Sequence, residues 1–261
     1  MLDKKLLIEV IKDQQEIFGD FLFENVNTAI EESMKKKDTV VKGTSENKIS
    51  IAENLFLEDF QKTESIEELN SKICNCQNCA LGKTRTKFVF GVGYPNANAM
   101  LIGEAPGRDE DLQGEPFVGR AGKLLNDILK AVNFKREEVY IANILKCRPP
   151  NNRDPLPLEM ETCIPYLHKQ IDLIQPKVIL CLGRVAANGL LNKKLSLGQL
   201  RESTFEFNGI KVMATYHPAA LLRNPNWKRG CWEDVQKFRK IYDDLHTRFA
   251  EASARRAGRQ D

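Results

Sequence analysis

The chain has 261 residues, of which 42% are hydrophobic, and a formal net charge of +3 at pH 7. This length favours one large domain, or one domain with an appendage, and the apolar content is sufficient for a buried core. No apolar run reaches the roughly 18–20 residues of a membrane span, and the N-terminus makes a poor signal peptide, which excludes a membrane partner and predicts a cytoplasmic protein. The mild charge permits nucleic acid as a partner without arguing for it.

Composition and periodicity divide the chain into four segments. Apolar residues at helical spacing near the N-terminus predict a helical extension, and the Lys-, Ser- and Gly-rich stretch after it predicts a flexible linker. The Arg-rich C-terminal tail is either solvated or in contact with DNA. The expected segments are a helical N-terminal extension (1–34), a linker (35–62), a main domain (63–250) that begins with a helix over about 63–73, and a basic tail (251–261).

The main domain alternates between short β-branched apolar runs and amphipathic stretches, which favours parallel strands joined by helices. Apolar runs stand at 87–90, 99–103, 139–144, 177–182 and 210–215. Helical patterns occupy 119–133, 157–174, 184–192 and 230–250. The sequence therefore predicts an α/β fold.

Three of these apolar runs end in polar side chains. Glu104 follows the second run, Asn143 closes the third, and His217 follows the fifth. Ligands of open α/β sheets bind outside the carboxyl ends of the strands, so the three side chains are expected to line one polar pocket. Asn143 could instead be a turn former. The lone histidines His168 and His246 lie inside predicted helices, which favours structural roles for both.

The seven cysteines suit a metal centre better than a disulfide framework, because their number is odd and the chain reads as cytoplasmic. Cys76 and Cys79 form a C-x2-C pair, and Cys147 and Cys163 form a second, wider pair. Four converging sulfurs could hold a metal or an iron–sulfur cluster; a zinc site or a redox pair is the alternative. Cys74 could replace Cys76 as a ligand. The remaining thiols, Cys181 and Cys231, are expected to be buried.

Several sequence blocks carry a family resemblance. CQNCALGKTRTK, GEAPG, GEPFVGRAGKLL, NILKCRPP and YHPA stand in this order over about residues 74–245. The chain resembles a family 4 uracil-DNA glycosylase, the iron–sulfur branch of the uracil-DNA glycosylase superfamily. The resemblance implies a three-layer α/β/α sandwich around a small, mainly parallel four-stranded sheet, with the helical extension preceding it. It also implies a structural [4Fe–4S] cluster bound by Cys76, Cys79, Cys147 and Cys163.

The same resemblance implies removal of uracil from DNA in base-excision repair by a monofunctional hydrolase. His217 is expected to stabilise the departing uracil, Asn143 to read its edge, and Phe117 to stack on it, unless Phe117 is only a hydrophobic anchor. Glu104 and Glu110 are the candidates for holding water or shielding the sugar cation, and Glu110 could also crowd the methyl group of thymine. Backbone groups around Ala105 and Pro106 are expected to bind water or uracil.

DNA contacts are expected from a wedge and from basic side chains. Leu221 and Leu222 could fill the gap left by the flipped base, with Arg223 on a phosphate; a helical turn that packs two leucines is the alternative. Further phosphate-binding candidates are Arg120, Lys123, Lys146 and Arg148. Asp109 and Asp111 are expected in a solvated loop.

Two other functions stay open at this point. One is a uracil-DNA binding protein that traps its target, which the absence of an inserted basic loop disfavours. The other is a polymerase-associated module with little turnover, whose partner could bind the N-terminal extension. The protein is expected to be a monomer.

Overall fold

The structure is a computed structural model that describes residues 59–257, with side chains for residues 59–245. The chain divides into two units, residues 1–63 and residues 64–261. The described part of the first unit contains the 3-10 helix η3 (Asp59–Lys62), which lies at the end of the predicted linker. The helices predicted over residues 4–34 lie outside the described residues. Everything below concerns the second unit.

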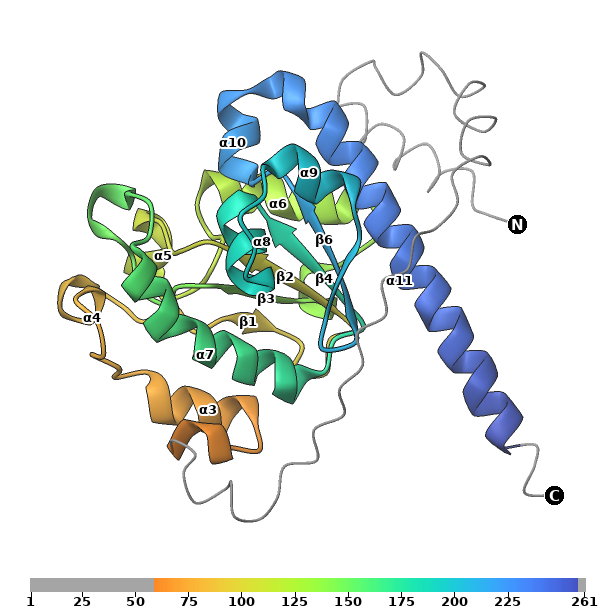
Figure 1. Cartoon of the computed structure of the whole chain (residues 1–261), viewed down its shortest axis with the longest axis horizontal. Helices are drawn as coiled ribbons and strands as arrows, with labels where there is room; N and C mark the ends of the chain where they lie inside the picture. The colour runs from red at the N-terminus through yellow and green to blue at the C-terminus, as the bar shows by residue number, and fades with distance from the viewer. Residues whose placement is uncertain (1–58, 258–261) are drawn as a thin grey trace. The chain divides into compact units, whose positions relative to one another are not determined.

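The second unit alternates strands and helices along the chain, as Figure 1 shows. Its strands are β1 (Val92–Gly93), β2 (Ala99–Gly103), β3 (Tyr140–Asn143), β4 (Val178–Leu182), β5 (Phe205–Phe207) and β6 (Ile210–Thr215). Its α-helices are α3 (Ile66–Ile73), α4 (Leu81–Thr84), α5 (Arg108–Gln113), α6 (Arg120–Ala131), α7 (Pro157–Ile174), α8 (Arg184–Leu191), α9 (Leu197–Glu202), α10 (Pro218–Arg223) and α11 (Lys228–Ala257). Short 3-10 helices are η4 (Arg136–Glu138), η5 (Pro150–Asn152) and η6 (Pro225–Trp227).

The sheet has six strands in the order β1-β3-β2-β4-β6-β5. The four central strands are parallel, which is the predicted parallel sheet, and the edge strands β1 and β5 are antiparallel additions to it. The sheet is therefore wider than the four strands expected. The apolar run 87–90 forms no strand: Val89 N–H donates to the Lys146 carbonyl at 2.9 Å, and β1 begins two residues after the run ends.

Helices cover both faces of the sheet, which confirms the three-layer α/β/α arrangement. Figure 1 shows α7 and α8 in front of the sheet and α6 behind it. On the α6 side, Leu125 of α6 and Phe238 of α11 pack against the sheet residues Leu101 and Leu180 around a gap of about 10 Å³. The central strands β2, β3 and β4 are buried along their whole length, as expected for strands covered on both faces.

Local sequence signals explain where several helices begin. Ser65 caps α3 by accepting a hydrogen bond from Glu68 N at 3.1 Å. In α7, Pro157 occupies the first turn and Glu159 accepts from Leu156 N at 2.8 Å, so the helix starts where its sequence predicts. Helix α11 runs to Ala257, into the segment predicted as a tail. None of the described helices is long and apolar enough to cross a membrane.

Candidate active site

A pocket of about 350 Å³ opens at the carboxyl ends of β2, β3 and β6. All seven residues predicted for catalysis or substrate binding line it, together with the DNA-binding candidate Arg223. Seven of its residues were not singled out from the sequence. The complete lining is Glu104, Ala105, Pro106, Gly107, Glu110, Phe117, Ala121, Asn143, Pro149, Asn152, Arg153, Asp154, His217, Ala219 and Arg223.

Asn143 ends β3 with a side chain that is only 2% exposed. Its Oδ1 is buried and has no hydrogen-bond partner among the described residues, a property shared there only with His168 Nε2. Gly103, its register partner on β2, makes room for it: a Cβ at position 103 would overlap Asn143 Oδ1 and lie 2.7 Å from Phe117 Cζ. A buried acceptor without a donor is costly, so this atom is prepared for a ligand that donates a hydrogen bond.

Phe117 is held in the pocket by an uncommon backbone conformation. Its φ of 54° lies in the left-handed region, where a bulky residue is strained. Gly122 on α6 permits this, because a Cβ there would overlap the Phe117 carbonyl. The ring lies 5.5 Å from the His217 ring, centroid to centroid, at an interplanar angle of 32°. The strain places an aromatic face beside the imidazole.

His217 caps α10 through its imidazole, whose Nδ1 accepts a hydrogen bond from Ala219 N at 3.1 Å. An accepting Nδ1 leaves the proton of the neutral ring on Nε2. Burial, together with the nearby charge of Arg223, lowers the pKa of His217 to about 4. The ring is therefore neutral at pH 7 and offers Nε2–H as a donor.

The two predicted carboxylates, Glu104 and Glu110, have different surroundings and hydrogen bonds. Burial raises the pKa of Glu104, the nearby charge of Asp154 raises it too, and Arg184 opposes both. Glu110 instead uses both oxygens on the backbone: Oε2 accepts from Gly107 N at 3.1 Å, and Oε1 accepts from Val118 N and Gly119 N at 3.0 and 3.1 Å. Glu110 thus orders the two loops that carry Ala105 and Phe117, and Glu104 is the better placed of the two to hold water.

Two predicted DNA contacts are wrong because their side chains are buried. Leu221 is 1% exposed, whereas its neighbour Leu222 is 42% exposed and Arg223 is exposed at the pocket. Lys146 is fully buried, and its Nζ donates to the Asn143 carbonyl at 2.9 Å and to Gln170 Oε1 at 2.5 Å. Neither Leu221 nor Lys146 can reach DNA. Arg120, at the start of α6, is exposed as a phosphate contact requires.

Asp111 is also buried, although it was expected in a solvated loop. It is 4% exposed and accepts from Thr86 N at 2.8 Å, so it anchors the segment after α4.

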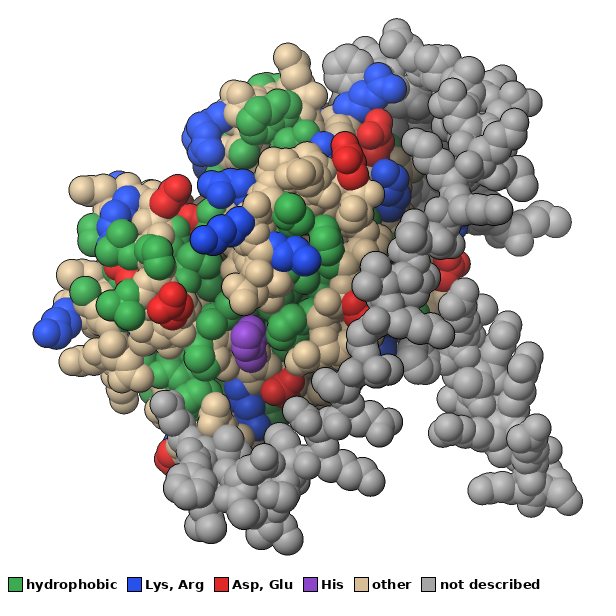
Figure 2. All heavy atoms as spheres, viewed as in Figure 1, with side chains coloured by type: hydrophobic (Ala, Val, Ile, Leu, Met, Phe, Trp, Pro, Cys, Tyr) green, Lys and Arg blue, Asp and Glu red, His purple; other side chains and the backbone are tan. Residues whose placement is uncertain are grey.

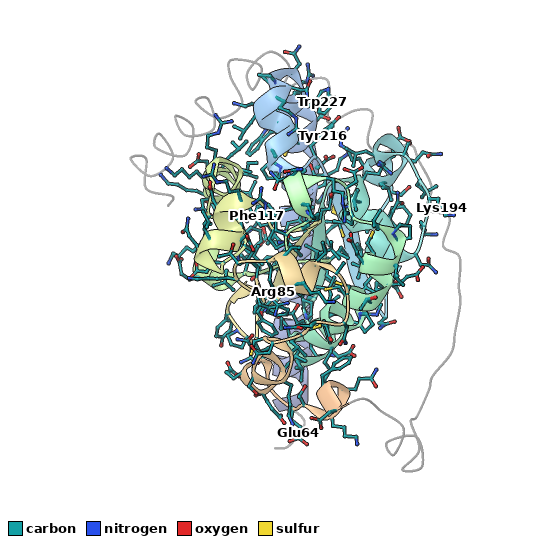
Figure 3. The ribbon with its side chains drawn as sticks, turned by 90° about the vertical axis from the view of Figure 1, so that its left-hand side faces the viewer. Glu64, Arg85, Phe117, Lys194, Tyr216 and Trp227 are labelled. Carbon is teal, nitrogen blue, oxygen red and sulfur yellow. The ribbon has the colours of Figure 1, made fainter. Side chains whose placement is uncertain are left out.

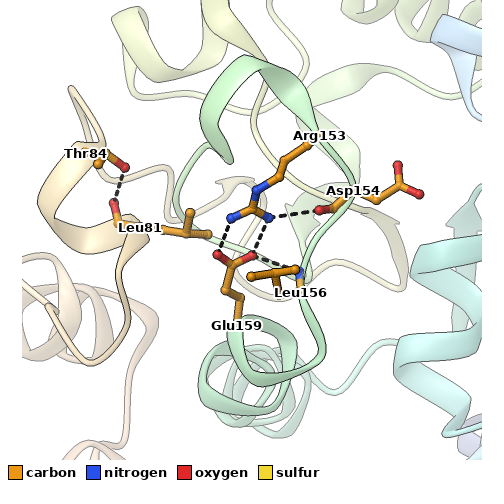
Figure 4. Close-up of polar contacts among 6 residues, drawn as sticks. All are labelled: Leu81, Thr84, Arg153, Asp154, Leu156 and Glu159. Carbon is orange, nitrogen blue, oxygen red and sulfur yellow. Dashed lines mark hydrogen bonds and ion pairs between the residues drawn. The ribbon is translucent and has the colours of Figure 1, made fainter.

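The loop before α7 brings Arg153 and Asp154 to the pocket, which the sequence reasoning missed. Figure 4 shows the two bonds of Arg153 to Glu159, at 2.9 and 2.6 Å, and its bond to the Asp154 carbonyl at 2.9 Å. A two-point Arg–carboxylate pair holds the loop in place. An Arg six residues before the Glu of a helix start was the signal that could have revealed it.

Charge interactions link Cys147 to Cys76 and Cys79, and Cys163 to Cys147 and Cys79. Burial raises the pKa of Cys147, the hydrogen bond and charge of Arg85 lower it, and the nearby Cys79 and Cys76 raise it. Burial also raises the pKa of Cys163, Lys146 lowers it, and the nearby Cys147 and Cys79 raise it. Cys74 enters neither interaction, and its Sγ lies 3.6 Å from the Ser71 carbonyl.

Polar groups surround these sulfurs. Lys146 N and Asn78 N donate to Cys163 Sγ and Cys76 Sγ at 3.3 and 3.5 Å, and Arg85 Nη1 donates to Cys147 Sγ at 3.3 Å. Donors of this kind stabilise thiolates. Across residues 59–245, no three His, Cys, Asp or Glu side chains form a group that could hold a single metal ion.

Comparison of the sequence with known proteins identifies the family. The family model of the uracil DNA glycosylase superfamily matches residues 90–246. The chain belongs to the uracil-DNA glycosylase superfamily. It is 45% identical over 186 residues to a type-4 uracil-DNA glycosylase of Archaeoglobus fulgidus, covering 68% of this chain and 94% of that protein.

Two further relatives carry the same name. The type-4 uracil-DNA glycosylase of Sulfurisphaera tokodaii is 43% identical over 187 residues, which cover 68% of this chain and 85% of that protein. That of Saccharolobus solfataricus is 42% identical over 194 residues, which cover 71% of this chain and 88% of that protein. The expected family is thereby confirmed.

Proposed function

We propose that this chain hydrolyses the N-glycosidic bond of uracil in DNA and leaves an abasic site, as a monofunctional glycosylase of base-excision repair. The observation that carries the proposal is the unpartnered, buried Oδ1 of Asn143 in a pocket that also holds a neutral histidine. Uracil presents an N3–H donor and two carbonyl acceptors on the edge that such a pocket would meet. The base must leave the DNA stack to enter, at a cost of about a few kcal/mol.

Asn143 explains selection against cytosine. Its Oδ1 accepts from the N3–H of uracil, and its amide can donate to O4. Neutral cytosine has an acceptor at N3 and an amine at C4, so both contacts become unfavourable. A site built for a hydrogen bond strongly rejects an analogue that leaves its buried polar groups unpaired.

His217 supplies the stabilising donor for bond cleavage. As the glycosidic bond breaks, uracil leaves as an anion and the sugar becomes oxocarbenium-like. The Nε2–H of the neutral imidazole donates to the uracil oxygen on which this charge develops, without first having to lose a proton. Phe117 packs against the imidazole and offers its ring to the flipped base.

Glu104 completes the reaction on the sugar side. Its carboxylate, close to Asp154, holds a water molecule and stabilises the cationic sugar. Water then adds to the anomeric carbon, and the proton it releases neutralises the uracil anion. Glu110 positions the loops around this water through its three backbone bonds. Arg223, Arg120 and Leu222 are assigned to DNA, the two arginines to phosphates and the leucine to the gap left by the base.

The cysteine set fits the [4Fe–4S] cluster that the family resemblance implies. We assign Cys76, Cys79, Cys147 and Cys163 as its ligands, because charge interactions link Cys147 and Cys163 to the others and three of the four sulfurs, all but that of Cys79, receive backbone or Arg85 donors. The cluster would join the segment after α3 to the loop after β3 and to α7, and it would supply no step of the hydrolysis. The four-segment organisation, the monomeric state, the cytoplasmic location and a protein partner for residues 1–34 stay predictions.

A gel assay tests the function. A uracil-containing oligonucleotide incubated with the protein and then treated with alkali should break at the uracil position. Asn143→Ala and His217→Ala should each slow this reaction by roughly 100- to 1000-fold, the cost of a lost preorganised donor. The matched controls are Asn126→Ala on the exposed face of α6 and His168→Ala on α7, both outside the pocket. Full activity in both pocket variants would refute the site, and a covalent protein–DNA band would favour trapping.

A further inference from the structure

A pair of exposed apolar side chains lies on the segment that follows His217. Leu222 of α10 is 42% exposed and Trp227 of η6 is 43% exposed. The first was assigned above to the gap in DNA, and the second has no role in the pocket. Trp227 follows the pocket residue Arg223 by four positions, so its exposed indole lies on the segment that leaves the pocket.

Trp227 is held by stacking on the residue before the pocket histidine. Its ring lies 5.3 Å from the Tyr216 ring, centroid to centroid, at an interplanar angle of 23°. Figure 3 shows Tyr216 and Trp227 next to each other, with Phe117 of the pocket nearer the centre of the view. One face of the indole is therefore covered by Tyr216, and the ring keeps a large exposed area.

A buried ion pair fixes Tyr216 in turn. The Arg201 guanidinium lies 4.2 Å from the Tyr216 ring centroid, and its Nη1 donates to the Tyr216 hydroxyl at 2.8 Å. Arg201 also donates to both oxygens of Asp234, at 2.6 and 3.2 Å, and Thr215 Oγ1 donates to the same carboxylate at 2.7 Å. Asp234 is 2% exposed. The indole thus rests on a rigid support and need not be ordered when a ligand arrives.

The surroundings of Trp227 are basic. Arg223 is exposed at the pocket, and Arg229 follows the indole with 67% of its side chain exposed, beside Glu233. Figure 2 shows hydrophobic side chains gathered with Lys or Arg side chains over the part of the surface where α10 lies. An aromatic platform flanked by cations matches single-stranded nucleic acid, in which bases have exposed faces and phosphates carry the charge.

We propose that Trp227 is a stacking platform for an unpaired nucleobase next to the flipped uracil, an inference that rests on the proposed function. Extruding a nucleotide removes the stacking partner of its neighbours and unpairs the base opposite. The indole, on the same ten-residue segment as the wedge Leu222, takes up one of these bases. Tyr216 and Arg201 act as positioning residues, because they hold the indole without touching DNA.

Fluorescence tests the contact directly. The chain has two tryptophans, and Trp232→Phe leaves Trp227 as the reporter. Uracil-containing DNA with a 2′-fluorinated sugar, which resists cleavage, should quench this signal as it binds, because a stacked base quenches an indole. Binding is followed independently by anisotropy of a labelled strand. Binding without any change in the Trp227 emission would overturn the proposal.

Kinetics separates the contact from the chemistry. Trp227→Ala should raise KM for a uracil oligonucleotide by about tenfold, within the range for one lost base–aromatic stack, and affect kcat much less. Trp227→Phe should restore most of the affinity. The control Tyr94→Ala removes another exposed aromatic (52% exposed), which follows β1 near the amino end of β3 and so lies away from the carboxyl ends of the strands. It should leave both constants unchanged.

Two substrates identify the base. A higher KM on both single- and double-stranded DNA assigns the stacked base to the uracil strand, and an increase on double-stranded DNA alone assigns it to the opposite strand. An unchanged KM for Trp227→Ala on both substrates refutes the platform. An inactive wild-type protein would instead refute the proposed glycosylase activity, so the two failures are distinguishable.

Discussion

At the scale of single residues, His217 makes the stability of the fold depend on pH. Its pKa is about 4 in the folded chain because of burial and Arg223, against about 6.5 for an unperturbed histidine. Between these values the unfolded chain binds a proton that the folded chain does not, so stability rises with pH across this window. This contribution is complete above about pH 6.5 and lost as the pH falls to about 4.

The prediction is a difference between two melting curves. Between pH 7 and pH 4.5, the melting temperature of wild type should fall more than that of His217→Gln, because glutamine does not titrate. Differential scanning fluorimetry at several pH values measures this, and the comparison cancels the carboxylates common to both proteins. Parallel curves for the two proteins would mean that the imidazole is not held neutral.

Gly103 should be more sensitive to substitution than its position in an apolar strand suggests. A Cβ at this residue would overlap Asn143 Oδ1 and press on the Phe117 ring. Gly103→Ala is expected to lower kcat/KM by about 100-fold, the effect of misplacing catalytic groups by about 1 Å, and to destabilise the fold by about 1–3 kcal/mol.

The matched control for this variant is Gly198→Ala on α9, where the nearest atom to an added Cβ is Ser196 Oγ at 3.9 Å. It should be active and as stable as wild type. Equal activities of the two alanine variants in the gel assay would contradict the packing described for the pocket.

The sequence predicted which residue types meet in the pocket but not every orientation. Strand ends that carry Glu104, Asn143 and His217 could be read from apolar runs, since parallel strands bring their carboxyl ends to one edge. The choice between Leu221 and Leu222 could not be made, because neighbouring positions of a six-residue helix share no visible period. The burial of Lys146 was also hidden, since its partner Gln170 lies on a helix far along the chain.

At the scale of elements, Lys146 joins the end of β3 to α7. Its ammonium donates to the Asn143 carbonyl and to Gln170, whose amide donates to the Phe90 carbonyl at 3.0 Å. Lys146→Met should lower the free energy of unfolding by about 1–3 kcal/mol for each acceptor left without a donor. Urea denaturation measures it, with the exposed Lys123→Met as the control.

A double-mutant cycle tests the link between these elements. Lys146→Met and Gln170→Leu should be coupled by about 0.5–3 kcal/mol, because they remove two ends of one contact. Strictly additive losses would show that the lysine does not join the strand to the helix.

At the scale of the whole molecule, the four cysteine ligands connect segments that are distant in sequence. The protein is expected to be brown, with broad absorbance near roughly 400 nm from the iron–sulfur thiolate bonds. Cys76→Ser and Cys147→Ser should lose this absorbance and melt at lower temperature. Cys74→Ser is the matched control and should keep both, since Cys74 Sγ faces the Ser71 carbonyl.

Metal analysis of the purified protein accompanies the spectra. One zinc per chain and no colour would replace the cluster with a zinc site, and the assignment of the pocket would be unaffected. A colourless Cys74→Ser variant and a brown Cys76→Ser variant would show that Cys74, and not Cys76, is a ligand.

The architecture as a whole was well predicted because periodicity reports burial over long elements. The spans of β2, α7 and β6 agree with the predicted ones, since each is a complete apolar run or a complete amphipathic period. The edge strands of the sheet could not be predicted from the sequence. β1 and β5 have two and three residues, too few for a pattern, and they pair only because a neighbouring strand offers free backbone groups.

The short edge strands β1 and β5 also affect how the sheet meets other polypeptides. An open sheet edge exposes amide and carbonyl groups to which another polypeptide can add, and long flat edges promote aggregation. Here the outermost strands are brief and antiparallel, and β1 includes Gly93 at a φ of 133°. Neither edge strand has enough regular backbone for another strand to add in an amyloid-like manner. The buried apolar strands at the centre are thereby shielded from neighbouring molecules at high concentration.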